Sequence, residues 1–360
     1  MSRVAVDLTD QDLDAGSATG AEALLTASHI VQEFTVRGHG GVKGGVVQAV
    51  SDVSFEIRPG ETLGVVGETG SGKSTLARSV LQAPRPKSGK AVFRGTDLVE
   101  LRGRRLLEAR RHLQMVFQDP FGSLDPKWRV SEIVEEPLVA YDVGTRAERR
   151  ARVGEVLERV GLDPGVYGGR RPREMSGGQC QRVAIARALT LNPALIICDE
   201  AVSSLDVLIQ AQVLNLFEEL RGELGLSYLF IAHDLSLVKQ VSDRVAVMYL
   251  GKLCEVGLAE SLYRHPLHPY TTALIASIPS PEPGTAKGKV ERAISGEPPS
   301  PIDPPSGCRF RTRCPRAQER CAAEEPPLRP LGPDHVVACH FPMEPPVGGS
   351  REGGGATGRR

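Results

Sequence analysis

One short segment constrains the fold of this chain more than any other feature of its 360 residues. Residues 67–75 read GETGSGKST and match the phosphate-binding pattern GxxxxGK[ST]. An apolar, strand-like segment at 62–67 leads into the pattern and a helix is predicted over 73–81, which is the context the pattern requires. Glycines let successive N–H groups point inward at an anion, and the helix presents its positive end. The segment therefore predicts an α/β fold with a phosphate-binding loop.

Each residue type in this loop has its own expected role. Lys73 is expected to reach the β- and γ-phosphates of ATP, and the Ser74 hydroxyl is expected to bind Mg²⁺. The other loop residues complete the nucleotide site: Gly67, Glu68, Thr69, Gly70, Ser71, Gly72 and Thr75.

A carboxylate pair ends a second apolar strand. Residues 194–198 are apolar, and Asp199 and Glu200 follow directly. Open α/β sheets bind ligands at the carboxyl ends of their strands. Asp199 is expected to hold Mg²⁺ through its water shell, and Glu200 to polarise the attacking water. Such a pair standing alone could equally be a solvated loop, but the phosphate loop favours the catalytic interpretation.

Hydrophobic periodicity outlines the rest of the fold. Strands are expected at 30–36, 53–57, 194–198, 228–232 and 244–250, and helices at 131–141, 145–162, 207–220 and 235–241. Thr145 and Glu148 form a capping-box pattern at the start of one helix. The alternation predicts a mixed, mostly parallel β-sheet core with a helical insertion at about 119–180.

Composition excludes several classes of protein. Lys+Arg and Asp+Glu both number 44, and this neutral balance argues against a nucleic-acid binder. No apolar stretch approaches the roughly 20 residues that a membrane span needs. The N-terminal residues are acidic and lack an apolar signal-peptide core, so the cytosol is the expected compartment. A membrane role would therefore require a partner.

A third glycine-containing segment identifies the family. Met175, Ser176, Gly177, Gly178 and Gln179 precede a helical pattern, and this segment resembles the LSGGQ signature of the ATP-binding cassette (ABC) family, with Met for Leu. The resemblance covers roughly residues 28–260. It implies that Ser176, Gly177, Gly178 and Gln179 grip the γ-phosphate held by a second ABC subunit, so that two cassettes sandwich the nucleotides.

Further roles follow from this resemblance. Gln118 resembles the family's loop glutamine, which contacts Mg²⁺ in the catalytic site. In the family this glutamine also links the nucleotide site to the helical insertion, where the transporter binds. His233 resembles the switch histidine at the γ-phosphate, and residues 203–206 resemble the loop that crosses the dimer interface. Phe34 is the expected aromatic stacked on adenine. With Glu200, Gln118 and His233 form the expected catalytic set.

The C-terminal region carries four cysteines in a C-x5-C-x6-C-x17-C spacing: Cys308, Cys314, Cys321 and Cys339. In a cytosolic chain such a group indicates a metal site more than disulfides, and neither zinc nor free thiols are excluded. Residues 262–342 resemble the extension of oligopeptide and dipeptide importer ATPases, with parts shared by nickel importers. This resemblance implies a [4Fe–4S] cluster. Arg309, Arg311, Arg313 and Arg316 are expected to form a solvated basic face.

The expected organisation is a disordered leader at 1–27, an ABC domain at 28–260, a C-terminal domain at 261–344 and a flexible tail at 345–360. The resemblance implies an ATPase at the cytoplasmic face of the cell membrane that energises peptide import. Its implied partners are two transmembrane permeases and an extracytoplasmic solute-binding protein. A nickel importer of the same branch is the near alternative. A soluble ABC ATPase acting on nucleic acid or the ribosome is the distant one, which the neutral charge and the single cassette disfavour.

Overall fold

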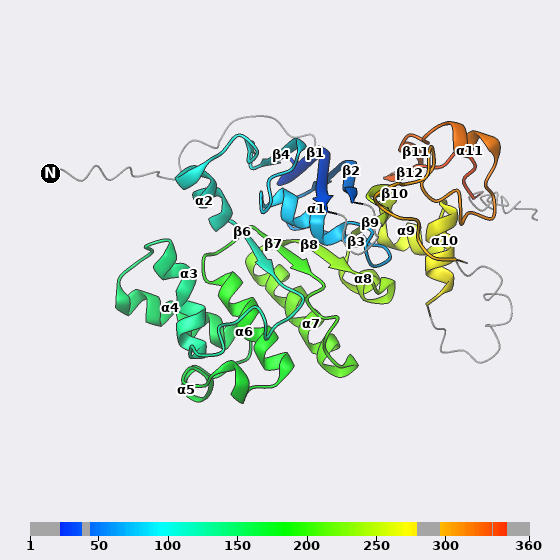
Figure 1. Cartoon of the computed structure of the whole chain (residues 1–360). Helices are drawn as coiled ribbons and strands as arrows, with labels where there is room; N and C mark the ends of the chain where they lie inside the picture. The colour runs from blue at the N-terminus through cyan, green and yellow to red at the C-terminus, as the bar shows by residue number, and fades with distance from the viewer. Residues whose placement is uncertain (1–21, 38–43, 279–295, 333, 344–360) are drawn as a thin grey trace, which may run out of the picture.

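The structure is a computed structural model that describes residues 22–37, 44–278, 296–332 and 334–343. Its strands form a four-stranded and an eight-stranded sheet, and a group of helices packs against one end of the larger sheet and extends away from it (Figure 1). The predicted tail at 345–360 and most of the predicted leader lie outside the described residues. The leader prediction is wrong at residues 25–27, because Leu25 and Ala27 are buried and pair with two neighbouring strands.

The four-stranded sheet is antiparallel and has the order β2-β1-β4-β5. The sequence patterns predicted only parts of its first two strands and missed the others. Its strands, and the helix α2 that follows them, have these bounds: β1 (Leu25–Val36), β2 (Gly45–Ile57), β4 (Ser88–Phe93), β5 (Thr96–Asp97) and α2 (Gly103–Arg111).

The eight-stranded sheet has the order β11-β12-β10-β9-β3-β8-β7-β6. The strands from β9 to β6 pair in parallel, as the alternating pattern predicted. An antiparallel edge is added by β10 (Lys252–Leu258), β12 (His335–Val337) and β11 (Arg329–Gly332). The parallel strands are β3 (Thr62–Val66), β6 (Leu113–Val116), β7 (Leu195–Asp199), β8 (Ser227–Ala232) and β9 (Arg244–Tyr249).

Side chains of the parallel strands alternate between two hydrophobic cores, as a strand period of two requires. On β7, Leu195 and Ile197 pack with the antiparallel sheet and α1 (Lys73–Val80). Ile196 and Cys198 pack on the other face with α7 (Val207–Leu224) and the helical insertion. Burial on both faces explains why these strands are uninterrupted apolar runs.

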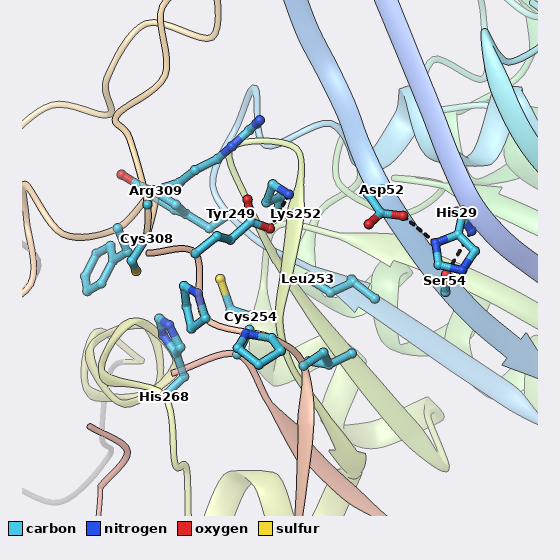
Figure 2. A pocket seen from close by; sticks show the side chains of 17 residues that line it. His29, Asp52, Ser54, Tyr249, Lys252, Leu253, Cys254, His268, Cys308 and Arg309 are labelled. Carbon is cyan, nitrogen blue, oxygen red and sulfur yellow. Dashed lines mark hydrogen bonds and ion pairs between the residues drawn. The ribbon is translucent and has the colours of Figure 1, made fainter. Parts of the chain in front are cut away.

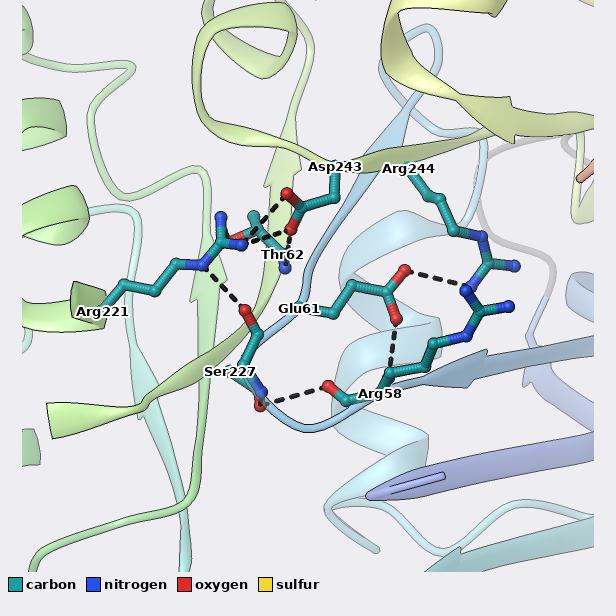
Figure 3. Close-up of polar contacts among 8 residues, drawn as sticks. Arg58, Glu61, Thr62, Arg221, Ser227, Asp243 and Arg244 are labelled. Carbon is teal, nitrogen blue, oxygen red and sulfur yellow. Dashed lines mark hydrogen bonds and ion pairs between the residues drawn. The ribbon is translucent and has the colours of Figure 1, made fainter. Parts of the chain in front are cut away.

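Ion pairs and hydrogen bonds of charged residues connect β3, α7 and β9 at the end of the sheet where β3 begins (Figure 3). Asp243, just before β9, accepts the N–H of Thr62 at 2.8 Å and pairs with Arg221 of α7 at 2.8 Å. Glu61 accepts from Arg244 at 3.0 Å and is only 7% exposed. These bonds hold the start of β3 against β9 and α7. The position of the phosphate loop, which follows the other end of β3, is therefore fixed relative to both elements.

The helical insertion lies between β6 and β7 in sequence and extends away from the sheets (Figure 1). The Thr145–Glu148 capping box is present, with the Glu148 carboxylate 2.7 Å from the N–H of Thr145. No helix in the described part of the chain is long and apolar enough to cross a membrane. The insertion comprises α3 (Val130–Ala140), α4 (Arg146–Arg159), α5 (Pro164–Tyr167), the 3₁₀ helix η1 (Pro172–Glu174) and α6 (Gly177–Leu189).

The C-terminal region continues the eight-stranded sheet, because β12 pairs with β10. The buried carboxylate of Glu255 fastens it: it accepts the N–H groups of Leu267 and His268 at 2.7 and 2.9 Å and contacts His335 Nε2 at 2.7 Å. The boundary near residue 260 stays a prediction. The elements after β8 are α8 (Leu235–Val241), β10 (Lys252–Leu258), α9 (Ala259–Arg264), α10 (Pro269–Ala276), α11 (Glu319–Ala323), β11 (Arg329–Gly332) and β12 (His335–Val337).

Candidate functional site

The phosphate loop joins the end of β3 to α1, as its sequence predicted. Gly67 and Gly72 have φ values of 155° and 103°, which favour glycine. A Cβ at Gly67 would lie 2.0 Å from the carbonyl oxygen of Met248, and one at Gly72 would lie 2.1 Å from that of Ala49. Both glycines are therefore required for the loop to fit against its neighbours as well as for its curvature.

The Lys73 side chain is buried beneath this loop. Its Nζ donates to the carbonyl oxygens of Gly67 at 2.7 Å and Glu68 at 3.0 Å. Burial lowers the pKa of Lys73, and the nearby carboxylates of Glu200, Asp199 and Glu68 oppose that shift. The side chain thus places one positive charge where the loop and the two strand-end carboxylates meet.

Ser74 and Asp199 form the polar pair at the base of the site. The Ser74 hydroxyl donates to Asp199 Oδ1 at 2.5 Å, and Arg78 lies 3.7 Å from Oδ2. Burial raises the pKa of Asp199, and the hydrogen bond from Ser74 and the positive charge of Arg78 oppose the shift. Oxygen ligands of this kind suit Mg²⁺, so the donor set fits the predicted metal. The buried Ser71 hydroxyl beside them has no hydrogen-bond partner among the described residues.

Glu200 lies beside the two other members of the expected catalytic set. Gln118 Nε2 donates to Glu200 Oε2 at 2.7 Å, and His233 Nδ1 lies 3.5 Å from the same oxygen. Glu200 has a φ of 51°, a left-handed conformation that is rare for a residue with a side chain and is common at functional sites. Two residues that are far apart in the sequence, Gln118 and His233, therefore converge on the carboxylate of a third.

The signature segment begins α6. The Ser176 hydroxyl accepts the N–H of Gln179 at 3.3 Å, and Gln179 Oε1 accepts the N–H of Ser176 at 3.0 Å. Ser176 is exposed, so its helix N-terminus is presented outward. Gly178 has an additional role, since a Cβ there would lie 2.5 Å from Ile209 of α7.

For Asp206 and Phe34, the described residues show no hydrogen bond or ion pair to the residues of the phosphate loop or to Glu200. Asp206 caps α7 by accepting the N–H of Ile209 at 3.0 Å, and the next two side chains, Val207 and Leu208, are 79% and 77% exposed. Phe34 lies on β1 opposite Val47 and is 40% exposed. Its stacking on adenine stays a prediction.

The four C-terminal cysteines come together around one small cavity, which Cys308, Cys314, Cys321 and Cys339 all line. Burial raises the pKa of Cys308 and of Cys339 to about 11. Within the described residues, however, no group of three or more His, Cys, Asp or Glu side chains is arranged to hold a metal ion. The predicted metal site is therefore not confirmed.

The expected solvated basic face is wrong for two of its four arginines. Arg309 is only 9% exposed, and the Arg313 side chain is 7% exposed. Sequence reasoning missed these residues, because their partners lie in the N-terminal half of the chain.

Two family models match the chain. One described as ABC transporter matches residues 50–203, from before the phosphate loop to just beyond Glu200. One described as oligopeptide/dipeptide transporter, C-terminal region, matches residues 254–321, which includes the first three cysteines of the group.

The chain is also similar to curated proteins and solved structures. The oligopeptide transport ATP-binding protein AppF of Bacillus subtilis (strain 168) is 49% identical over 330 residues, or 90% of this chain and 99% of that protein. The oligopeptide transport ATP-binding protein OppF of Haemophilus influenzae is 46% identical over 322 residues, or 88% and 97%. The dimeric, post-hydrolysis ATP-binding cassette MJ0796, bound to ADP and Pi, matches with a TM-score of 0.58 and 27% identity over 65% of this chain and 98% of that one. The cassette cbiO1 from Clostridium perfringens matches with a TM-score of 0.57 and 26% identity over 67% and 91%.

Proposed function

This chain belongs to the ATP-binding subunits of the ABC transporter family, in the oligopeptide and dipeptide branch, and we propose that it hydrolyses MgATP to drive peptide import through partner permeases. One observation carries this proposal. The convergence of Gln118 and His233 on Glu200, beside Lys73 and Asp199, occurs in a chain whose C-terminal region matches the peptide-transporter model.

In the proposed mechanism each residue of the site has a defined task, and Gln118 has two. Lys73 neutralises phosphate charge, and Glu200 accepts the proton of the attacking water while Gln118 and His233 hold its carboxylate in place. Ser74, Asp199 and Gln118 would hold Mg²⁺, which neutralises the charge developing on the phosphate oxygens. This set supplies what phosphoryl transfer requires on one side of the nucleotide.

We propose that a second ABC subunit, either a copy of this chain or a sibling, supplies the other side. The exposed N-terminus of α6 at Ser176 suits an anion presented from outside the chain. The exposed Val207 and Leu208 next to residues 203–206 suit a subunit interface. ATP binding would then favour the closed pair, and closure would be the step that drives the permeases.

A groove on the helical insertion is the proposed permease contact. Trp128, Glu132, Glu135, Glu136 and Val139 line a hollow of about 400 Å³ along α3. Cytoplasmic segments of membrane proteins carry an excess of Lys and Arg. A short basic, amphipathic permease segment therefore complements this acidic groove with its apolar floor.

Purification of a tagged chain from membranes tests the proposal. We expect two polytopic permeases, a sibling or second cassette, and a peptide-binding extracytoplasmic protein to accompany it. Charge reversal in the groove by Glu135→Lys should reduce permease recovery at least 10-fold, because it replaces attraction with repulsion of basic segments. Glu218→Lys, on the exposed face of α7, is the matched control and should change nothing.

The same purification separates the alternatives. A binding protein that retains nickel instead of peptide would identify a nickel importer. A preparation without permeases that carries ribosomes or nucleic acid would refute transport and leave the ATPase assignment intact.

We also propose that the four C-terminal cysteines hold a [4Fe–4S] cluster as a structural clamp. The four thiols around a common cavity support this proposal, because a four-iron cluster takes one thiolate on each iron.

Anaerobic purification of the full chain tests the cluster. We expect about four iron atoms and four acid-labile sulfides per chain, lost on Cys314→Ser substitution and retained on Cys180→Ala substitution, since Cys180 lies in α6 and is not among the residues that line the cysteine cavity. Zinc without sulfide, or no metal at all, would contradict this part of the proposal.

A further inference from the structure

The segment between Cys308 and Cys314 docks onto the nucleotide-binding half of the chain. Arg309 donates to Gln48 Oε1 at 2.6 Å and to Ser51 Oγ at 2.9 Å, and also to the carbonyl oxygen of Leu250. Arg309, Cys308, Tyr249 and Lys252 line a cavity of about 300 Å³. Figure 2 shows Arg309 beside Tyr249 in the wall of this cavity. The contact therefore joins the cysteine-rich segment to β2 and to the turn after β9.

Aromatic packing makes this contact rigid. Phe310 is buried, and its ring centroid lies 5.2 Å from that of Tyr249 and 5.2 Å from that of Tyr270. Tyr249 and Tyr270 are themselves 4.7 Å apart. Such a cluster holds the segment in one position, because each ring fills the space between the other two.

Arg313 and Tyr270 then reach the phosphate loop itself. Arg313 Nη1 and Nη2 donate to Glu68 Oε2 and Oε1 at 2.8 and 3.1 Å, a two-bond pair with side-chain exposures of 7% and 25%. The Tyr270 hydroxyl accepts the N–H of Glu68 at 2.9 Å. Glu68 is the second residue of the loop, and its carbonyl oxygen accepts from Lys73. The C-terminal region thus holds both the backbone and the side chain of a loop residue.

The charge of Glu68 gives this contact a functional consequence. A carboxylate in a phosphate-binding loop repels the anion that the loop must bind. The Arg313 guanidinium neutralises that carboxylate and turns it toward the C-terminal region. Lys73 of the loop makes its hydrogen bond to the carbonyl oxygen of Glu68, whereas the bonds to the Glu68 carboxylate come from Arg313 of the C-terminal region.

We propose that Arg313 is a positioning residue for nucleotide binding, which neutralises Glu68 and fixes the phosphate loop from the C-terminal region. The inference rests on the proposed ATPase function. Under this proposal the cysteine-rich region contributes directly to nucleotide binding through Arg313.

Equilibrium binding of a non-hydrolysable MgATP analogue to the full chain tests the inference. Arg313→Gln leaves an uncompensated charge on Glu68 in the phosphate-binding loop, so the Kd should rise about 10-fold at low salt, because this charge repels the phosphates. The rise should shrink at 0.5 M salt through screening. Glu68→Gln combined with Arg313→Gln should return the Kd to within about 2-fold of the parent, because the uncompensated charge is gone. Arg313→Lys, which keeps the charge, should bind almost normally.

Arg311→Gln is the matched control, since Arg311 donates to Ser306 within the C-terminal region. It should not change the Kd. If the double substitution binds no better than Arg313→Gln, or if Arg313→Gln binds like the parent, the inference is wrong. Failure of the parent chain to bind the analogue would instead refute the proposed ATPase function.

Discussion

Glu200→Gln is expected to bind MgATP as tightly as the parent and to hydrolyse it at least 100-fold more slowly. The substitution keeps the size of the side chain and an oxygen that can accept from Gln118 Nε2, which lies 2.7 Å from Glu200 Oε2. It removes the group that accepts a proton from water, and general-base catalysis contributes about 10²–10⁴-fold. ATP-bound subunits should therefore accumulate as the closed dimer.

Phosphate release and gel filtration with and without MgATP measure both effects. Glu218→Gln, on the exposed face of α7, is the matched control and should turn over normally. Hydrolysis by Glu200→Gln at the parent rate would show that another group activates the water, and His233, 3.5 Å from Glu200, would be the next candidate.

Lys73→Ala is expected to weaken MgATP binding at least 100-fold and so to abolish turnover. Lys73 is only 4% exposed and carries the positive charge between the loop and the carboxylates of Asp199 and Glu200. Without it, two carbonyl oxygens lose their donor and the carboxylates face the phosphates without compensation.

Nucleotide titration of the purified variant measures this loss. Lys90→Ala, which removes an exposed lysine from β4, controls for the change in net charge and should bind normally. A Kd within 3-fold of the parent for Lys73→Ala would be incompatible with the assigned role. The weaker binding of Lys73→Ala should differ in origin from that of Arg313→Gln. High salt or the additional Glu68→Gln substitution should restore binding to Arg313→Gln and not to Lys73→Ala.

Much of the nucleotide-binding half was predictable because its signals are local. The strand before Gly67, the helix from Lys73 and the Thr145 capping box each depend on residues within a few positions of one another. In the antiparallel sheet, β4 and β5 were missed because these short strands contain charged and glycine residues. Leu25 lay hidden in a segment whose composition otherwise indicated a disordered leader.

The burial of two arginines in the C-terminal region could not be predicted from the sequence. A run of arginines beside cysteines indicates a solvated basic face when only neighbours in the chain are considered. Burial of Arg309 and Arg313 depends on Gln48 and Glu68, which no local pattern connects to them.

The sequence by itself determined the phosphate loop, the strand-end carboxylates and the signature helix. These features depend on glycine spacing, capping residues and apolar periodicity, which are set by residues close to one another in the sequence. Only the tertiary structure decided that Gln118 and His233 meet on Glu200 and that Arg313 holds Glu68 across 245 positions of sequence. The physical reason is that an ion pair or hydrogen bond is specified by proximity in space, and proximity between distant segments exists only after the sheets and cores have formed.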